Sequence, residues 1–184
     1  LMREIPGMVV INPCDDVEAR AAVKAAYEYV GPVYMRFGRL AVPVINDETT
    51  YKFEIGKGVE LRSGKDITII ATGLPVSESL EAAKFLAEDG IDAQVINIHT
   101  IKPLDEELVV KAAQATGRVF TVEEHSIIGG LGSAVMECLA EQNPVKVTRI
   151  GVRDTFGESG PAKDLLHKYE LDAEGIYKQI KAAL

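Results

Sequence analysis

The chain has 184 residues, 47% of them hydrophobic, which is enough to bury one full core and part of a second. With 20 Lys and Arg residues against 28 Asp and Glu residues, its net charge of −8 argues against nonspecific binding to nucleic acid or to an anionic membrane surface. Two distant cysteines, Cys14 and Cys138, indicate no disulfide framework or zinc site, and the lack of an apolar run of roughly 20 residues predicts a cytoplasmic protein without a membrane span.

The chain begins with a short helix-like segment and a strand. Residues 1–5 have a helical composition and stop at Pro6-Gly7, so we expect the sequence to start inside a helix whose earlier part lies upstream. The apolar run 8–11 has the pattern of a buried strand.

A complete helix and a second strand follow. Asp15 and Glu18 have the spacing of an N-terminal capping box, which predicts a helix from about residue 16 to residue 30. Gly31-Pro32 ends this helix before the run 33–37, which predicts a strand. Together with the strand before it, this segment is expected to form one β-α-β unit.

Regular periodicity is lost between Gly38 and Gly64. This stretch is polar and rich in turn residues and has no run long enough for a helix, so we interpret it as a linker between domains. The run 66–73 restarts the pattern with β-branched residues that suit a strand buried on both faces, as strands of parallel sheets are.

Strands and helices alternate through the rest of the chain, which favours right-handed crossovers and a largely parallel sheet. Further strands are predicted at residues 91–98, 118–122 and 145–150, and helices at residues 77–89, 104–115, 131–141, 161–168 and 173–183. The fold class is therefore α/β, with a largely parallel sheet in a three-layer arrangement.

The segment 122–135 joins the end of a strand to a glycine-rich helix entry and carries two glutamates and a histidine at 123–125. Free backbone N–H groups at Gly130-Leu131-Gly132 could hold an anion, and Asp154 lies where a ribose-binding acid would fall in a dinucleotide site. Against this hypothesis, Val135 occupies the third glycine position of GxGxxG. The alternative is that the glycines allow close packing while the polar groups form hydrogen bonds or an interface.

Other polar residues give weaker patterns. The three histidines are scattered without the spacing of metal ligands, and no serine lies in a GxSxG elbow. Arg36 and Arg39 lie at the end of the 33–37 strand and just after it, where planar guanidinium groups could clamp a phosphate. For an arbitrary pair, ordinary surface arginines remain the alternative.

In this order, the segments resemble the transketolase superfamily, which includes deoxyxylulose-phosphate synthase and the beta subunits of 2-oxoacid dehydrogenases. The segments similar to the last third of the family's pyrimidine-binding domain are residues 1–8, 13–18 and 31–39. Those similar to the start and centre of its C-terminal domain are residues 55–58, 64–73, 122–125 and 129–132. The resemblance implies a C-terminal remnant of the pyrimidine-binding domain at 1–45, a linker at 46–64 and a transketolase C-terminal domain at 65–184.

In this family, thiamine diphosphate and Mg²⁺ lie between two subunits and are held by a separate domain with a GDG...N motif, which this sequence lacks. The glutamate that promotes cofactor activation would lie upstream of Leu1. The resemblance therefore implies that the complete enzyme uses both cofactors, that these residues alone bind neither, and that they include no catalytic residue. In relatives that use sugar phosphates, an arginine that matches Arg39 binds the substrate phosphate. Arg36 is a weaker candidate than Arg39, because only some relatives have it.

The function implied by the resemblance is that of the C-terminal portion of a transketolase, a transferase of the pentose phosphate pathway that moves a two-carbon ketol unit between sugar phosphates. The run Phe37-Gly38-Arg39-Leu40 is similar to the split transketolases, whose cofactor-binding half is a separate polypeptide. The fragment alone is expected to be inactive and to serve substrate-phosphate contact and assembly, as a homodimer or with a separate N-terminal transketolase subunit. The synthase, and a docking module like that of the dehydrogenase beta subunits, remain alternatives.

Overall fold

The most apolar runs of the sequence form the central strands of a five-stranded sheet. The computed structural model describes residues 1–39 and 41–184, and its larger sheet has the strand order β3-β5-β4-β7-β8. These strands are β3 (Val59–Arg62), β4 (Ile67–Ala71), β5 (Ala93–Asn97), β7 (Arg118–Ser126) and β8 (Lys146–Val152). Strand β4 is parallel to β5 and β7, and β7 is parallel to β8, whereas β3 is antiparallel to β5. The prediction of a largely parallel sheet is confirmed.

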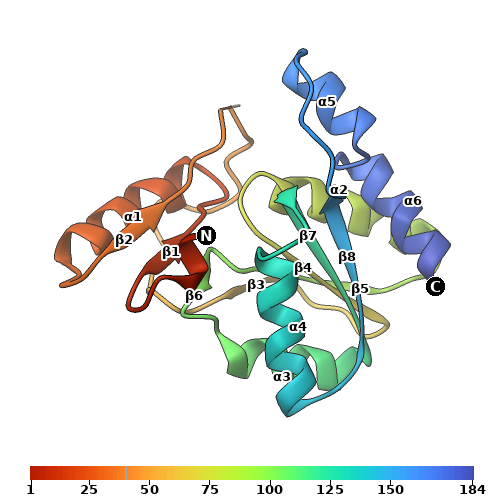
Figure 1. Cartoon of the computed structure of the whole chain (residues 1–184). Coiled ribbons are helices and arrows are strands. Elements are labelled where there is room, and N and C mark those ends of the chain that lie inside the picture. Colours follow the sequence, from red (N-terminus) through yellow and green to blue (C-terminus); the bar gives the residue numbers. More distant parts are fainter. Residues whose placement is uncertain (40) are drawn as a thin grey trace.

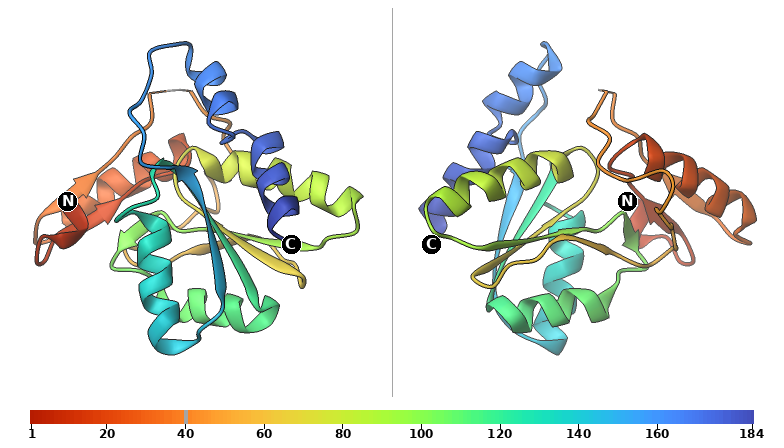
Figure 2. Two further views of the ribbon diagram at one scale, coloured as in Figure 1. Left: turned by 45° about the vertical axis from the view of Figure 1, so that its right-hand side comes forward. Right: turned by 180° about the vertical axis from the view of Figure 1, so that it is seen from behind.

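Helices cover both faces of this sheet (Figures 1 and 2). On one face lie α2 (Pro75–Glu88) and α6 (Ala173–Ala183), and on the other α3 (Glu106–Thr116) and α4 (Leu131–Gln142). Because successive side chains of a strand point to opposite faces, Ile69 packs with Leu86 of α2 while its neighbour Ile70 packs with Val109 of α3. Two cores on one sheet give the three-layer α/β arrangement that the alternating pattern predicts.

A smaller unit precedes this domain and shares a sheet with it. It contains the 3₁₀ helix η1 (Met2–Glu4), β1 (Val9–Ile11), α1 (Asp16–Glu28) and β2 (Val33–Met35). Strand β1 is parallel to β2, as a β-α-β unit requires, and its other edge pairs antiparallel with β6 (Thr100–Lys102). Since β6 directly follows β5 of the larger domain, the two parts are joined by backbone hydrogen bonds as well as by the chain.

The structure differs from the sequence prediction at several boundaries. The stretch 46–64, expected to be a linker, contains β3, which belongs to the larger sheet; the sequence pattern does not predict β6 either. Both strands are short, and β3 lies at an edge and is only half-buried, so neither has a strong apolar pattern. Strand β7 continues to Ser126, so residues 123–125 lie within the strand, and α5 (Ala162–Lys168) and α6 end the chain as predicted.

A buried polar network joins α1 to the larger domain. As the capping box predicts, Asp15 Oδ1 accepts the Glu18 N–H (2.8 Å). The Glu18 carboxylate is fully buried and accepts the Cys14 N–H (2.7 Å), the Asn97 side-chain amide at the end of β5 (2.9 Å) and the Tyr51 hydroxyl. Burial, together with the Glu18 charge, raises the pKa of Cys14 and of Tyr51 above their ordinary values, so both groups stay neutral.

Glu18→Ala removes the shared acceptor of this network and leaves buried donors unpaired. We expect the free energy of unfolding to fall by about 3 to 5 kcal/mol, because each unpaired buried donor costs about 1 to 3 kcal/mol. Chemical denaturation measures the change. The control is Glu48→Ala, which removes an exposed partner of Arg20 and is expected to cost less than about 1 kcal/mol. Equal losses in the two variants would contradict the role given to Glu18.

A buried histidine lies beside this network at the start of β6. His99 is 1% exposed, its ring lies 4.2 Å from that of Phe53, and its Nδ1 is 2.9 Å from the Thr100 hydroxyl. Burial lowers the pKa of His99, and the charges of Glu18 and Asp105 oppose this shift only in part.

The depressed pKa of His99 predicts a loss of stability in mild acid. The unfolded histidine takes up its proton near pH ~6.5 and the folded one only at lower pH, so the unfolded state binds more protons. Stability from His99 is thus present above pH ~6.5 and is lost as pH falls through the folded pKa. When chemical denaturation is measured between pH ~7 and ~5, the free energy of unfolding should fall less for His99→Gln than for the parent chain.

The control for this series is His167→Gln. The hydrogen bond to Asp172 raises the pKa of His167, so its contribution has the opposite sign and is lost as pH rises. The fall in unfolding free energy on acidification should therefore persist in His167→Gln. If it disappeared in that variant, the assignment to His99 would be contradicted.

Candidate functional site

The smaller unit and the larger domain line an open cavity of about 330 Å³ where their strands end. We call it the junction cavity. Its polar wall contains Asn12 after β1, Arg36 after β2 and His125 near the end of β7, and its apolar wall includes Val10, Ile101 and Ile128. Ligands of parallel sheets bind at the carboxyl ends of strands, and small-molecule sites combine an apolar wall with a few polar groups. The junction cavity has both properties.

Arg36 is positioned by the end of β2. Its backbone N–H donates to the Ile11 carbonyl (2.9 Å), which continues the β1–β2 ladder by one residue, and its Nη2 donates to the Glu124 carbonyl (3.2 Å). The half-buried guanidinium forms no ion pair with any residue in the described part of the chain. Its remaining N–H groups are therefore available to a ligand.

The glycine-rich entry of α4 is occupied by a carboxylate of the chain itself. The fully buried Glu123 accepts the N–H groups of Leu131 (2.7 Å) and Gly132 (2.9 Å), the first two residues of the helix. Helix N-termini favour negative charge, and here the protein supplies it. The dinucleotide hypothesis is therefore wrong at this helix, and the expectation of a hydrogen-bonding role for Glu123 is confirmed.

Glu123 also holds the ring of His125. The His125 Nδ1 lies 2.9 Å from Glu123 Oε2 and 3.3 Å from the Ser126 carbonyl oxygen. Both neighbours are acceptors, so Nδ1 carries the proton, and in the neutral ring Nε2 is left as an acceptor. His125 lines the junction cavity, so its ring can meet a ligand there.

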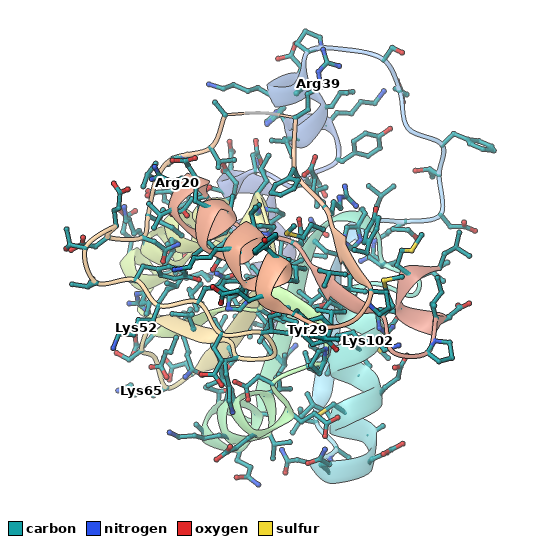
Figure 3. All side chains as sticks on the ribbon, turned by 90° about the vertical axis from the view of Figure 1, so that its left-hand side faces the viewer. Arg20, Tyr29, Arg39, Lys52, Lys65 and Lys102 are labelled. Atoms are coloured by element: carbon teal, nitrogen blue, oxygen red, sulfur yellow. The ribbon has the colours of Figure 1, made fainter. Side chains whose placement is uncertain are left out.

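Arg39 lies elsewhere. It is exposed, it is not among the residues that line the junction cavity, and Figure 3 shows it at the end of the molecule that carries α5. Residues 41–43 nearby line a second cavity, of about 590 Å³, together with Lys163 and Leu166 of α5. The structure thus does not bring Arg36 and Arg39 to one site. Leu40, the last residue of the Phe37–Leu40 run, lies outside the described residues.

The described residues do not fit the diphosphate and metal of the cofactor that the family resemblance implies. The helix entry that could bind a diphosphate is filled by Glu123, and residues 1–39 and 41–184 contain no group of three or more His, Cys, Asp or Glu side chains placed to hold a metal ion. Both cysteines are buried and unpaired. None of the described helices is both long and apolar enough to cross a bilayer.

Comparison with known proteins shows the family. Residues 56–176, well over half of the chain, match the family described as "Transketolase, C-terminal domain". The chain belongs to this family. A solved structure named "Split gene transketolase, inactive beta4 tetramer" is 48% identical to this transketolase-family chain, with a TM-score of 0.95 over 100% of this chain and 60% of that one.

Several curated relatives are similar along nearly the whole chain. The 6-deoxy-6-sulfo-D-fructose transketolase subunit SqwH of Clostridium sp. (strain MSTE9) is 48% identical over 97% of this chain and 55% of its own length. An apulose-4-phosphate transketolase subunit of Phocaeicola vulgatus is 44% identical over 97% and 57%. The 1-deoxy-D-xylulose-5-phosphate synthase 1 of Geobacter sulfurreducens is 42% identical over 100% and 29%. The chain therefore spans little more than half of the first two relatives.

Gly130 tests the arrangement at the helix entry. A Cβ atom at this position would overlap the Glu123 carboxylate and the His125 ring, so Gly130→Ala should lower the free energy of unfolding by about 1 to 3 kcal/mol through overpacking. Gly157→Ala is the matched control, since a Cβ there would meet nothing within 4 Å. Thermal or chemical denaturation of both variants measures the difference, and similar stabilities would contradict the close approach of Glu123.

Proposed function

We propose that the chain is the C-terminal section of a transketolase that moves a two-carbon ketol unit between sugar phosphates. The observation that carries this proposal is the 48% identity, over 97% of the chain, to a transketolase subunit that is itself less than twice as long. The TM-score of 0.95 to a split transketolase supports the same assignment. A cytoplasmic location and a place in the pentose phosphate pathway belong to the same proposal.

Arg39 is the proposed contact to the phosphate of the substrate. One relative is named for a sugar with a sulfo group, and another for a sugar with a phosphate group. Both groups are anions that a guanidinium can bind through two hydrogen bonds. Arg39 is exposed in a loop after β2, so it suits a substrate held mainly by other parts of the complete enzyme. Substrate contact through Arg36 would instead require the ligand to enter the junction cavity.

The chain is proposed to act within an assembly. Thiamine diphosphate, when bound in the complete enzyme with Mg²⁺, supplies the carbanion stabilisation that ketol transfer requires. The smaller unit exposes apolar side chains on and beside α1, among them Tyr27 (91% exposed) and Val30 (98% exposed). Exposed apolar surface of this kind favours association, with a second copy or with a separate cofactor-binding transketolase subunit.

Arg39→Ala tests the substrate contact in the assembled enzyme. We expect KM for sugar phosphates to rise about 10- to 100-fold, because a hydrogen bond to a charged group contributes about 1.5 to 3 kcal/mol. The KM for the sugars without phosphate should change little. Arg20→Ala, which removes an exposed arginine that pairs with Asp16 and Glu48, is the matched control. Equal KM values in both variants would contradict the contact.

The same assay separates transketolase from the synthase, which the 42% identity to a deoxyxylulose-phosphate synthase keeps as a second candidate. A ketose phosphate donor should support transfer to an aldose phosphate, whereas pyruvate should not. Turnover with pyruvate alone as donor would overturn the ketol-transfer assignment in favour of the synthase.

A further inference from the structure

The charges on the wall of the junction cavity differ from those of the chain as a whole. The chain carries 28 Asp and Glu residues and a net charge of −8. Within the described part of the chain, the residues that line the cavity include two arginines, Arg3 and Arg36, and a histidine, but no Asp or Glu. A cavity without carboxylates on its wall, in an acidic protein, is a suitable place for an anion, because no lining carboxylate repels it.

The charges next to the cavity are already compensated. Arg3 donates a hydrogen bond to the Gly129 carbonyl (3.0 Å) and forms an ion pair with Glu137, so its positive charge is already neutralised. Glu123, behind the wall, accepts two helix N–H groups as well as His125 Nδ1–H. Arg36 alone among these charged groups has no charged partner, and it is half-buried, where a charge–charge interaction is screened less than at the surface.

The second polar group of the cavity has a different hydrogen-bonding capacity. In the neutral ring, His125 Nε2 accepts a hydrogen bond and cannot donate one, because Glu123 and the Ser126 carbonyl fix the proton on Nδ1. A hydroxyl group is the donor that such a nitrogen pairs with. The cavity therefore offers a donor for an anionic oxygen at Arg36 and an acceptor for a hydroxyl at His125.

We propose that the junction cavity is a second anion site, separate from Arg39, which binds a small sugar phosphate with its phosphate on Arg36 and a sugar hydroxyl on His125 Nε2. A volume of about 330 Å³ lies at the lower end of the range of small-molecule sites and suits a ligand of this size. Glu123 is a positioning residue, because it acts on the ligand only through the orientation and tautomer of His125.

Binding is tested by isothermal titration of the purified chain, and of the assembled enzyme, with ribose 5-phosphate, inorganic phosphate and ribose. Ribose 5-phosphate should bind more tightly than inorganic phosphate, and ribose should bind weakest. Arg36→Ala should weaken the binding of both phosphates at least about 10-fold, because a hydrogen bond to a charged group is lost. Arg36→Lys should restore part of this loss, since it retains the charge.

His125→Phe isolates the hydroxyl contact. It should reduce the preference for ribose 5-phosphate over inorganic phosphate about 2- to 10-fold and leave the affinity for inorganic phosphate unchanged, since the ligand loses only a neutral hydrogen bond from its sugar hydroxyl. The matched controls are Arg20→Ala and His167→Phe, which replace an exposed arginine and an exposed histidine outside the cavity and should bind as the parent chain does. Circular dichroism of each variant checks the fold.

Three results would overturn the proposal. They are no measurable binding of ribose 5-phosphate by the parent chain and by the assembled enzyme, unchanged binding in folded Arg36→Ala, or loss of binding in Arg20→Ala. Since the titration needs no turnover, a failure here is distinct from a failure of ketol transfer: an active transketolase with an empty junction cavity would contradict only the second site.

Discussion

The arrangement of the two parts of the chain depends on one buried carboxylate. Glu18 caps the start of α1, accepts the side-chain amide of Asn97 at the end of β5, and accepts the hydroxyl of Tyr51 from the connecting segment. A buried charge is tolerated only when its hydrogen-bonding capacity is filled, so these three segments must meet at one point. That requirement fixes how the smaller unit sits on the larger domain and so brings the end of β2, with Arg36, to the end of β7.

The entry of α4 uses the same physical solution for a different purpose. A glycine-rich turn at a helix N-terminus has free N–H groups, and in nucleotide-binding proteins a phosphate satisfies them. Here Glu123 satisfies them from the preceding strand, and the missing side chain of Gly130 gives its carboxylate room. One carboxylate thereby anchors the helix and orients His125 toward the cavity. The glycine at position 130 is explained by this internal contact, without any bound nucleotide.

The sequence was sufficient for the α/β class, the order of the long elements and the parallel sheet, because the apolar periodicity of buried strands and amphipathic helices is local. It was insufficient for β3 and β6, which are short strands defined by their partners rather than by their own pattern. It also grouped Arg36 with Arg39, three residues apart, whereas β2 ends at Met35 and the chain then carries Arg39 away from the cavity. The cavity itself was not predictable, because its wall combines residues from widely separated parts of the chain.

The pairing of β6 with β1 has a consequence for how such a chain can be divided. Because a strand that follows β5 completes the sheet of the smaller unit, the halves on either side of residues 46–58 share a backbone ladder, the Glu18 network and the hydrogen bond from Lys102 to the Ile5 carbonyl (2.7 Å). Cleavage of the connecting segment would therefore yield two pieces that remain noncovalently associated. The connecting segment at residues 46–58 is therefore a place where the polypeptide could be cut without freeing the two parts to move relative to one another, because β1 and β6 still hold them together.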